Sequence, residues 1–388
     1  MIMYRSLKVI VAIWTMTALS VPLLTGQEDL WINPIFQPVE SNRASLTTPI
    51  VRLSGHTLAT VVNNGLIFSE DGMQTWSKPR QIHEGAPVNT MGRGVPRGGG
   101  SALLNLGDGR LVLLWRDRRE PGPLNEYWDR ATGNPVPHAR RDLWMVRSDD
   151  AGQSWSTPEK LFDRPGYFHT HIIKTNEGTV VAPIQYHARD PGRNVIRVFS
   201  SNDAGRTWHQ SEDLDIGGRG NHDGVLEQTL VQLKDGRIWM LMRTNLDEFY
   251  ESYSGDEGKT WSDPKPSGIS ASSSPGYLLR LSSGRIALVW NRLHPEGDED
   301  FPRRDGRNYL TDRPASWHRQ ELSIALSDDD GRSWRDPVVV ARHPKRNGRL
   351  SYPYVFEKEP GEIWVFTAHG KLQLSVDEQD LLTDLPLE

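Results

Sequence analysis

Short apolar runs, paired across glycine turns, recur from about residue 50 to the end of the chain. Examples are LKDGRIWMLMR at residues 233–243 and LSSGRIALVW at residues 281–290. Runs rich in Leu, Ile, Val and Trp on both sides of a glycine turn predict β-hairpins. The hairpin turns are expected at Gly55, Gly109, Gly178, Gly236, Gly284 and Gly361.

A polar motif alternates with these hairpins. Ser-x-Asp-x-Gly-x-Thr/Ser-Trp occurs without a mismatch at residues 148–155, 201–208, 254–261 and 327–334. A copy at 69–76 has its glycine one position early, and a worn sixth copy is expected to start at Ser375 with Asp377. Asp can accept hydrogen bonds from backbone amides, Gly can take a positive φ, and Trp can pack between strands. The motif, called the box below, therefore predicts a turn between two strands.

Hairpin, loop, third strand, box turn and fourth strand together form one unit, and the unit occurs six times. Four-stranded sheets repeated radially make a propeller. We therefore predict an all-β chain that folds as a six-bladed β-propeller of four-stranded antiparallel blades. Since no linker or low-complexity segment interrupts the repeats, residues 27–388 are expected to form one domain.

Strand order predicts which end of the propeller carries a binding site. Glycine turns and box turns lie at the same end of a four-stranded meander, and the loops between strands two and three lie at the other. From turn glycine to box aspartate the interval is 41 residues in blade 2 (109 to 150) and 45 in blade 5 (284 to 329), but 16 in blade 1 (55 to 71). The extra residues, 116–141 and 291–319, are interpreted as a substrate rim or, alternatively, as disordered decoration.

The N-terminus differs from the rest of the chain. Arg5 and Lys8 precede a mostly apolar stretch over residues 9–24, which predicts a secretory signal peptide over residues 1–26. The alternative is an uncleaved membrane anchor. We expect a secreted or periplasmic protein, with no stable membrane insertion once the leader is removed. The chain contains no cysteine, which excludes disulfides and thiolate catalysis. A net charge of −5 and the lack of a long basic run argue against nucleic acid as a partner.

Aligning the blades on their turn glycines gathers candidate site residues. Nine positions before the turn stand Glu227 in blade 4, Tyr352 in blade 6 and His169 in blade 3. Seven positions after the turn stand Arg243, Arg116, Gln185 and Asn291. Equivalent positions of a propeller lie around one axis, so we expect an acid, a phenol, an imidazole and guanidinium groups at a common mouth.

The boxes resemble the Asp-boxes of sialidases, and the resemblance extends over nearly the whole mature chain. In that family a Glu begins the inner strand of blade 4 and an Arg ends the next strand, as Glu227 and Arg243 do here. A family Arg lies eight residues before the blade 5 box serine, where this chain has Arg319, and the family nucleophile is a Tyr at the place of Tyr352. The resemblance implies that Glu227 activates Tyr352 and that Arg243 and Arg319 bind the substrate carboxylate.

The chain departs from the family pattern at blade 1. The nearest counterpart of the family's Arg-Ile-Pro motif is Arg43-Ala44-Ser45, and Arg116 is the alternative source of a third guanidinium. The family's acid/base Asp is missing from the corresponding loop. Asp117 is our candidate for that role, with Asp223 as its rival.

His169 and His171 would lie on one face of a strand, where they could form a metal pair. No third ligand is evident, which favours a substrate-contacting or core histidine over a metal site. We expect neither a metal nor another cofactor.

Three functions remain open from the sequence. The first is a retaining exo-glycosidase that releases a terminal acidic sugar, sialic acid, from a glycan. The second is a lyase or hydrolase of uronic-acid polysaccharides on the same scaffold, which the missing blade 1 Asp favours. The third is a non-catalytic glycan-binding propeller. A glycan or glycoconjugate is the expected partner in each case.

Overall fold

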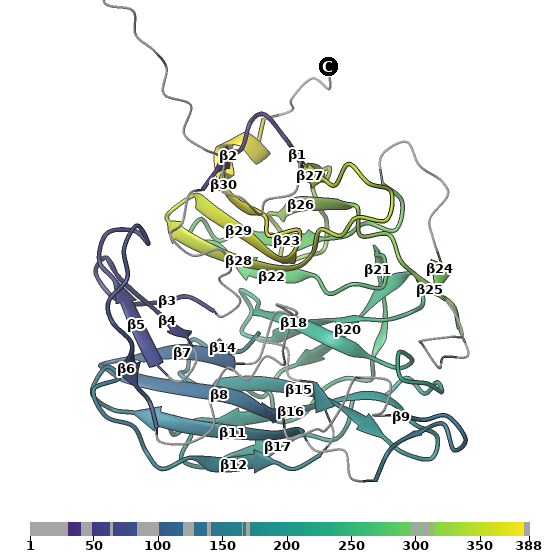
Figure 1. The fold of residues 1–388 in the computed structure, drawn as a ribbon, viewed down its shortest axis with the longest axis horizontal. Coiled ribbons are helices and arrows are strands. Elements are labelled where there is room, and N and C mark those ends of the chain that lie inside the picture. Colours follow the sequence, from purple (N-terminus) through teal and green to yellow (C-terminus); the bar gives the residue numbers. More distant parts are fainter. Residues whose placement is uncertain are drawn as a thin grey trace, which may run out of the picture.

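The computed structural model describes residues 30–39, 49–62, 65–83, 101–118, 128–137, 141–164, 166–167, 171–295, 303–304, 311 and 313–383. Antiparallel sheets follow one another around the molecule, from the purple blade through the teal and green blades to the yellow one (Figure 1). The predicted six-bladed propeller is thus confirmed. The expected signal peptide, Arg43 and His169 lie outside the described residues.

The first four blades follow the predicted strand order. Blade 1 consists of β3 (Val51–Ser54), β4 (Thr57–Val62), β5 (Gly65–Ser69) and β6 (Arg80–Gln81). Blade 2 consists of β7 (Ser101–Gly107), β8 (Arg110–Arg118), β11 (Arg141–Ser148) and β12 (Glu159–Phe162). Blade 3 consists of β14 (Ile173–Lys174), β15 (Val180–Ala188), β16 (Arg193–Ser201) and β17 (His209–Gln210), with β13 (Gly166–Tyr167) also paired to β15. Blade 4 consists of β18 (Leu226–Gln232), β19 (Ile238–Arg243), β20 (Glu248–Ser254) and β21 (Lys265–Ser270).

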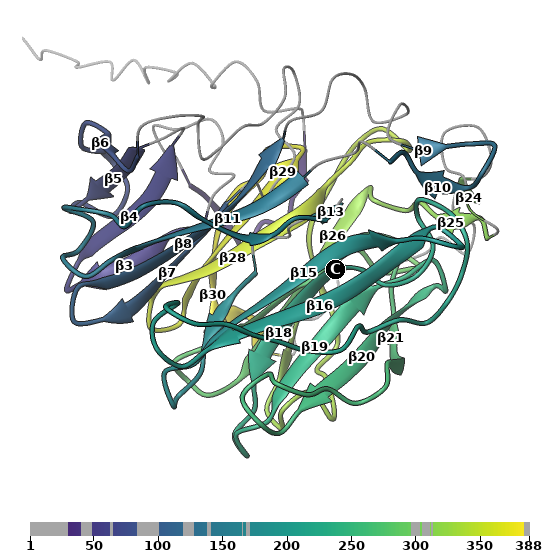
Figure 2. The same ribbon diagram turned by 90° about the horizontal axis from the view of Figure 1, so that it is seen from below.

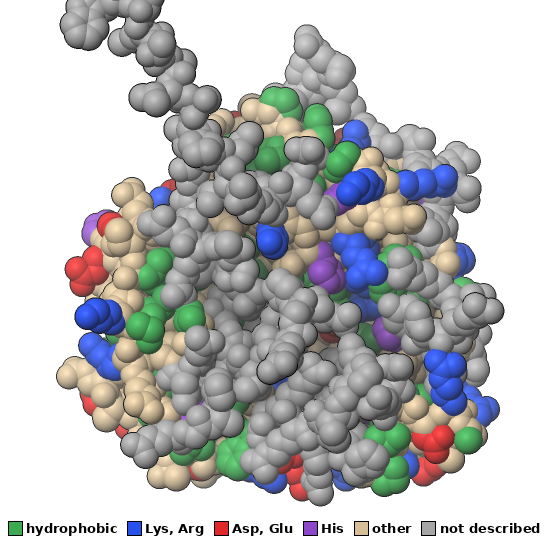
Figure 3. Space-filling model, viewed as in Figure 1, with side chains coloured by type: hydrophobic (Ala, Val, Ile, Leu, Met, Phe, Trp, Pro, Cys, Tyr) green, Lys and Arg blue, Asp and Glu red, His purple; other side chains and the backbone are tan. Residues whose placement is uncertain are grey.

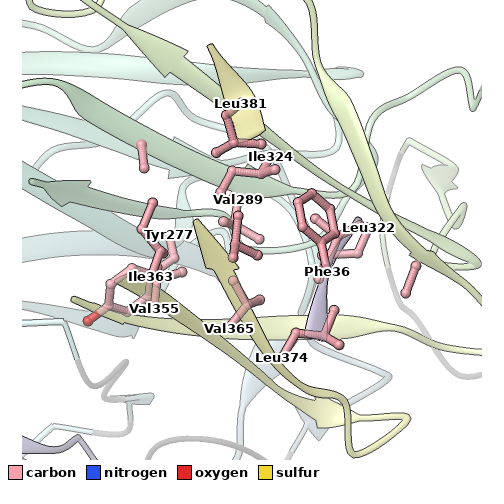
Figure 4. Close-up of a cluster of buried hydrophobic side chains, with 14 of the residues drawn as sticks. Phe36, Tyr277, Val289, Leu322, Ile324, Val355, Ile363, Val365, Leu374 and Leu381 are labelled. Atoms are coloured by element: carbon pink, nitrogen blue, oxygen red, sulfur yellow. The ribbon is translucent and has the colours of Figure 1, made fainter. Parts of the chain in front are cut away.

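The last two blades also take strands from the beginning of the chain. Blade 5 consists of β22 (Tyr277–Arg280), β23 (Ile286–Trp290), β26 (Glu321–Ser327) and β27 (Val338–Arg342), and β1 (Trp31–Ile32) pairs with β27. Blade 6 consists of β28 (Ser351–Glu359), β29 (Glu362–His369) and β30 (Gln373–Asp377), with β2 (Gln37–Pro38) as its outermost strand. Between these two short strands, Phe36 packs among Leu322, Val365 and Leu374 (Figure 4). The propeller is therefore closed by the pairing of β2 with β30, two strands that lie far apart in the sequence.

The worn sixth box does not form a box turn. Asp377 instead caps a 3₁₀ helix, η2 (Glu378–Leu381), by accepting a hydrogen bond from the Gln379 amide. Among the described residues no strand follows β30, and β2 pairs with β30 as the fourth strand of the blade. None of the described residues forms a helix that is long and apolar enough to cross a membrane.

The five remaining boxes fold as the sequence predicts. In the box of blade 2, one Asp150 carboxylate oxygen accepts from the Ser148 hydroxyl at 2.8 Å and from the Ser154 amide at 2.8 Å. The other oxygen accepts from the Ser154 hydroxyl at 2.5 Å. The Ser154 hydroxyl, followed by its backbone amide, lowers the pKa of Asp150 to about 2. Equivalent contacts hold Asp71, Asp203, Asp256 and Asp329. The box aspartates are thus turn-forming residues.

The long insertions of blades 2 and 5 contain small hairpins of their own. They are β9 (Trp128–Asp129) with β10 (Asn134–Pro135), and β24 (Arg303–Arg304) with β25 (Ala315–Ser316). Both hairpins lie on the same side of the molecule, at the upper right in Figure 2. Lys, Arg and His side chains gather to the right of centre on the face seen in Figure 3.

Candidate active site

The site is formed where inner strands begin and second strands end. Glu227 is the second residue of β18, and Tyr352 is the second residue of β28. Arg243 is the last residue of β19 and is paired across the sheet with Leu226, beside Glu227. The box turns lie at the opposite end of the blades, so they are separated from these site residues by the length of a blade.

Glu227 joins a tyrosine and an arginine from different parts of the chain. The Tyr352 hydroxyl donates a hydrogen bond to Glu227 Oε1 at 2.7 Å, and Arg243 Nη1 donates to Glu227 Oε2 at 2.6 Å. The side chain of Glu227 is 14% exposed and that of Arg243 only 2%. Burial, followed by the Glu227 charge, raises the pKa of Tyr352 to about 12. Tyr352 is therefore a neutral phenol in contact with a carboxylate that can take its proton.

The backbone of Tyr352 has an unusual conformation for a large residue. Its φ is 61°, in the left-handed region that side chains rarely adopt. On either side, Ser351 and Pro353 are paired with β29 through His369 and Thr367. The ring of His369 lies edge-on to that of Tyr352, 5.1 Å between centroids, and its Nδ1 is 2.7 Å from the Ser351 hydroxyl. Strain of this kind, about 1–3 kcal/mol, is typical of functional positions.

Arg319 is a second buried guanidinium next to this pair. It is 3% exposed, and its carbon Cζ lies 5.6 Å from the ring centre of Tyr352 and 3.9 Å from that of Trp317. Nη2 donates to the Ser273 carbonyl at 2.7 Å, while Nε has no hydrogen-bond partner and no carboxylate pairs with Arg319 within the described part of the chain. Burial and then the charge of Arg243 lower the pKa of Arg319 to about 10. A buried guanidinium of this kind can pair with an anion through its planar set of donors.

Gln185 and Asn291, which were also predicted for the site, form hydrogen bonds with the backbone of the segments around it. The Gln185 side-chain oxygen accepts from the Glu227 amide at 2.9 Å, and its Nε2 donates to Asn194 Oδ1 at 2.7 Å. Gln185 therefore positions the strand that carries Glu227. Asn291 donates to the carbonyls of Glu321 and Leu350 at 2.6 and 2.7 Å, which ties blade 5 to the segment that precedes β28.

The candidate acids have different surroundings. Asp223 is 4% exposed and accepts hydrogen bonds from the Arg219 amide, the Asn245 amide group and the Thr311 hydroxyl. Asp117 lies in β8, opposite Asp142 of β11, and its side chain is outside the described part of the structure. The same strand carries the partly buried Arg116.

His171 is packed in the core. It is 5% exposed, its ring stacks on that of Tyr277 at 4.3 Å between centroids, and its Nδ1 is 2.6 Å from the Thr229 hydroxyl. The core interpretation is thus the one its contacts support. Within the described residues, no group of three or more His, Cys, Asp or Glu side chains could hold a metal ion.

Ser273, Trp317 and His369 adjoin the predicted set but were not found from the sequence. Ser273 contacts both arginines: its hydroxyl accepts from Arg243 Nε at 3.0 Å, and its carbonyl accepts from Arg319. Ser273 and Trp317 lie in segments between strands, where no repeat pattern marks a position. His369 stands eight residues after its turn glycine, Gly361, whereas Arg243 stands seven after Gly236. A search that included the eighth position after each turn would have found His369.

Comparisons with known proteins agree with this architecture. The model of the BNR repeat-like domain family matches residues 130–365. A sialidase of Bacteroides fragilis is 26% identical over 222 residues, 53% of this chain, and the match spans only 38% of that relative's length. The structure of a Trypanosoma rangeli sialidase in complex with 2,3-difluorosialic acid, a covalent intermediate, aligns with a TM-score of 0.55 at 15% identity over 91% of this chain and 60% of that one. A Dyadobacter fermentans protein of unknown function aligns with a TM-score of 0.52 at 16% identity over 89% and 95%. The chain therefore belongs to the BNR repeat-like domain family, and its fold is the one seen in sialidases.

Proposed function

We propose that the chain is a retaining glycoside hydrolase that releases terminal sialic acid from glycans, with Tyr352 as the nucleophile. The observation that carries the proposal is the Tyr352 hydroxyl, hydrogen-bonded to Glu227 at 2.7 Å beside the buried guanidinium of Arg319. A glycosidase that acts on a neutral sugar has no need of a buried cation next to its nucleophile. A glycosidase that acts on a sugar with a carboxylate on the reacting carbon needs such a cation to bind that carboxylate.

The residue types suit that substrate. A carboxylate nucleophile would be repelled by the carboxylate of sialic acid, whereas a neutral tyrosine is not. Sialidases with a Tyr nucleophile are a recognised exception to the rule of two catalytic carboxylates. Arg243 and Arg319 can bind the substrate carboxylate, because the planar guanidinium matches its two oxygens.

The reaction takes two steps. In the first, the Tyr352 oxygen bonds to the anomeric carbon, its proton passes to Glu227, and the glycosidic bond breaks as the leaving oxygen takes a proton from an acid. We assign that acid to Asp117, because the three hydrogen bonds to buried Asp223 suit a structural role. In the second, water attacks the same carbon and gives its proton to the carboxylate of Asp117, while Glu227 returns a proton to the departing Tyr352 oxygen. Two inversions give net retention.

The relatives support this class of activity. The Bacteroides fragilis relative is named a sialidase, and the Trypanosoma rangeli sialidase structure holds 2,3-difluorosialic acid as a covalent intermediate. A secreted or periplasmic location, which the sequence of residues 1–26 predicts, would give the enzyme access to glycoconjugates.

The test is hydrolysis of an aryl α-sialoside between pH 4 and 8, with the first-formed anomer followed by proton NMR. We expect release of sialic acid with its α configuration retained. Absence of release by folded protein across that range would overturn the proposal. If an unsaturated uronate formed instead from a uronic-acid polysaccharide, the protein would be a lyase. Binding on a glycan array without turnover of any bound glycan would identify a glycan-binding propeller.

A further inference from the structure

One buried serine contacts both guanidiniums of the candidate site. Ser273 is 0% exposed and lies between β21 and β22. Its hydroxyl accepts from Arg243 Nε at 3.0 Å, and its carbonyl accepts from Arg319 Nη2 at 2.7 Å. Its own amide donates to the Ser316 hydroxyl at 3.0 Å, which fixes the backbone. The relative placement of the two arginines therefore depends on this residue.

A chain of hydrogen bonds with a defined direction leads to the Ser273 hydroxyl. The Asp223 carboxylate can only accept hydrogen bonds, so the Asn245 side chain must present its NH₂ group to it, at 3.3 Å. The Arg219 amide and the Thr311 hydroxyl are the other two donors to this carboxylate. The Asn245 oxygen then faces Ser273 and accepts its hydroxyl proton at 2.7 Å. Because a serine hydroxyl has a single proton, it can only accept from Arg243 Nε, which can only donate. Each donor in this series of hydrogen bonds therefore faces an acceptor.

We infer that Asp223, Asn245 and Ser273 form a positioning relay that orients the guanidinium of Arg243 toward the substrate carboxylate. The inference rests on the proposed function for the identity of that carboxylate. Asp223 and Asn245 are 4% and 6% exposed, so the relay acts in a medium of low dielectric, where such bonds are strong. Asp223 is then a positioning residue that acts on the substrate only through the relay.

Ser273→Ala tests the relay, because it removes the hydroxyl and leaves the carbonyl that holds Arg319. Ser272→Ala is the matched control: Ser272 is 2% exposed, and its hydroxyl has no hydrogen-bond partner among the described residues. We expect Ser273→Ala to raise the KM for an aryl sialoside about tenfold or more, the effect of one lost hydrogen bond to a charged group, while kcat changes less. In an Arg243→Lys background, which lacks the Nε–H, the further effect of Ser273→Ala should vanish.

A second measurement needs no substrate and so separates the relay from the proposed function. Hydrogen exchange of the Arg243 Nε–H is followed in ¹⁵N-labelled protein, with the signal assigned from Arg243→Lys. We expect Ser273→Ala to accelerate this exchange at least about tenfold and Ser272→Ala to leave it unchanged. Unchanged exchange in Ser273→Ala would overturn the relay even if the protein hydrolyses sialosides. Accelerated exchange in a protein without sialosidase activity would support the relay and reject the proposed function.

Discussion

Replacing Arg319 by methionine should stabilise the fold slightly while abolishing turnover. The pKa of Arg319 falls from its ordinary 12.5 to about 10, chiefly through burial. At about 1.4 kcal/mol per pKa unit, the charged form costs the folded state about 3 kcal/mol. Because the folded pKa lies below the unfolded one, this cost is present in full below pH 10. It is relieved only as the pH rises from about 10 to 12.5.

Two favourable contacts offset part of that cost. The hydrogen bond to the Ser273 carbonyl contributes about 1 kcal/mol, and the guanidinium over the Trp317 ring contributes about 1 kcal/mol. Arg319→Met keeps an unbranched apolar stem and loses both contacts together with the charge. The net expectation is a gain of about 1 kcal/mol in the free energy of unfolding.

Urea denaturation at pH 7 measures the difference, provided that the slope m is unchanged. The control is Arg292→Met, which breaks an ion pair of 2.7 Å with buried Glu321 and should cost about 2 kcal/mol, because Arg342 still pairs with that carboxylate at 2.9 Å. If Arg319 were likewise a structural residue, its replacement would also lower the free energy of unfolding by about 2 kcal/mol or more. Such a loss, or turnover that survives the substitution, would refute the interpretation of Arg319 as an anion-binding residue.

Further predictions concern the proposed nucleophile and the boxes. Tyr352→Phe should lower stability by only about 1 kcal/mol but turnover by several orders of magnitude, as measured by calorimetry and initial rates; near-normal turnover would contradict the assignment. Glu227→Gln should also cut turnover, and the double variant should be little worse than the worse single one, since the two residues act as a unit. The pKa of Asp150, lowered to about 2 chiefly by the Ser154 hydroxyl, implies that the stabilisation by this box is present above pH 4 and is lost as pH falls toward 2. Asp150→Ala should therefore lower the melting temperature at pH 7 and leave KM unchanged, and a raised KM would place this box at the substrate-binding end.

The fold was predictable because its signals are local. Each box holds its turn through contacts within a few residues, as Asp150 does with Ser148 and Ser154, and each recurs at a regular place. The two strands at the beginning of the chain were not predicted. β1 and β2 are two residues long, and only their pairing with strands some 300 residues away makes them strands.

The site was predictable in part, for a related reason. Glu227, Arg243 and Tyr352 occupy repeated positions of a blade, so aligning the blades brings them to one mouth, and the structure joins them by hydrogen bonds. Ser273 lies in a link between blades and Asn245 just beyond a strand end, where the sequence has no repeat. Asn291 shares the register of Arg243 but is fully buried and turned toward backbone carbonyls. The position of a residue in the repeat predicts where it lies in the blade, but not which groups its side chain contacts.

Closure of the ring by β2 has a consequence for the order of events during synthesis. Glu227 and Arg243 leave the ribosome more than 100 residues before Tyr352 does. The strand that carries Tyr352 becomes part of a complete blade only when β30 has been synthesised and pairs with β2. A nascent chain can thus fold blades 2 to 4 and still lack Tyr352, the proposed nucleophile, next to Glu227. The appearance of the proposed activity during synthesis would then mark the moment at which the ring closes.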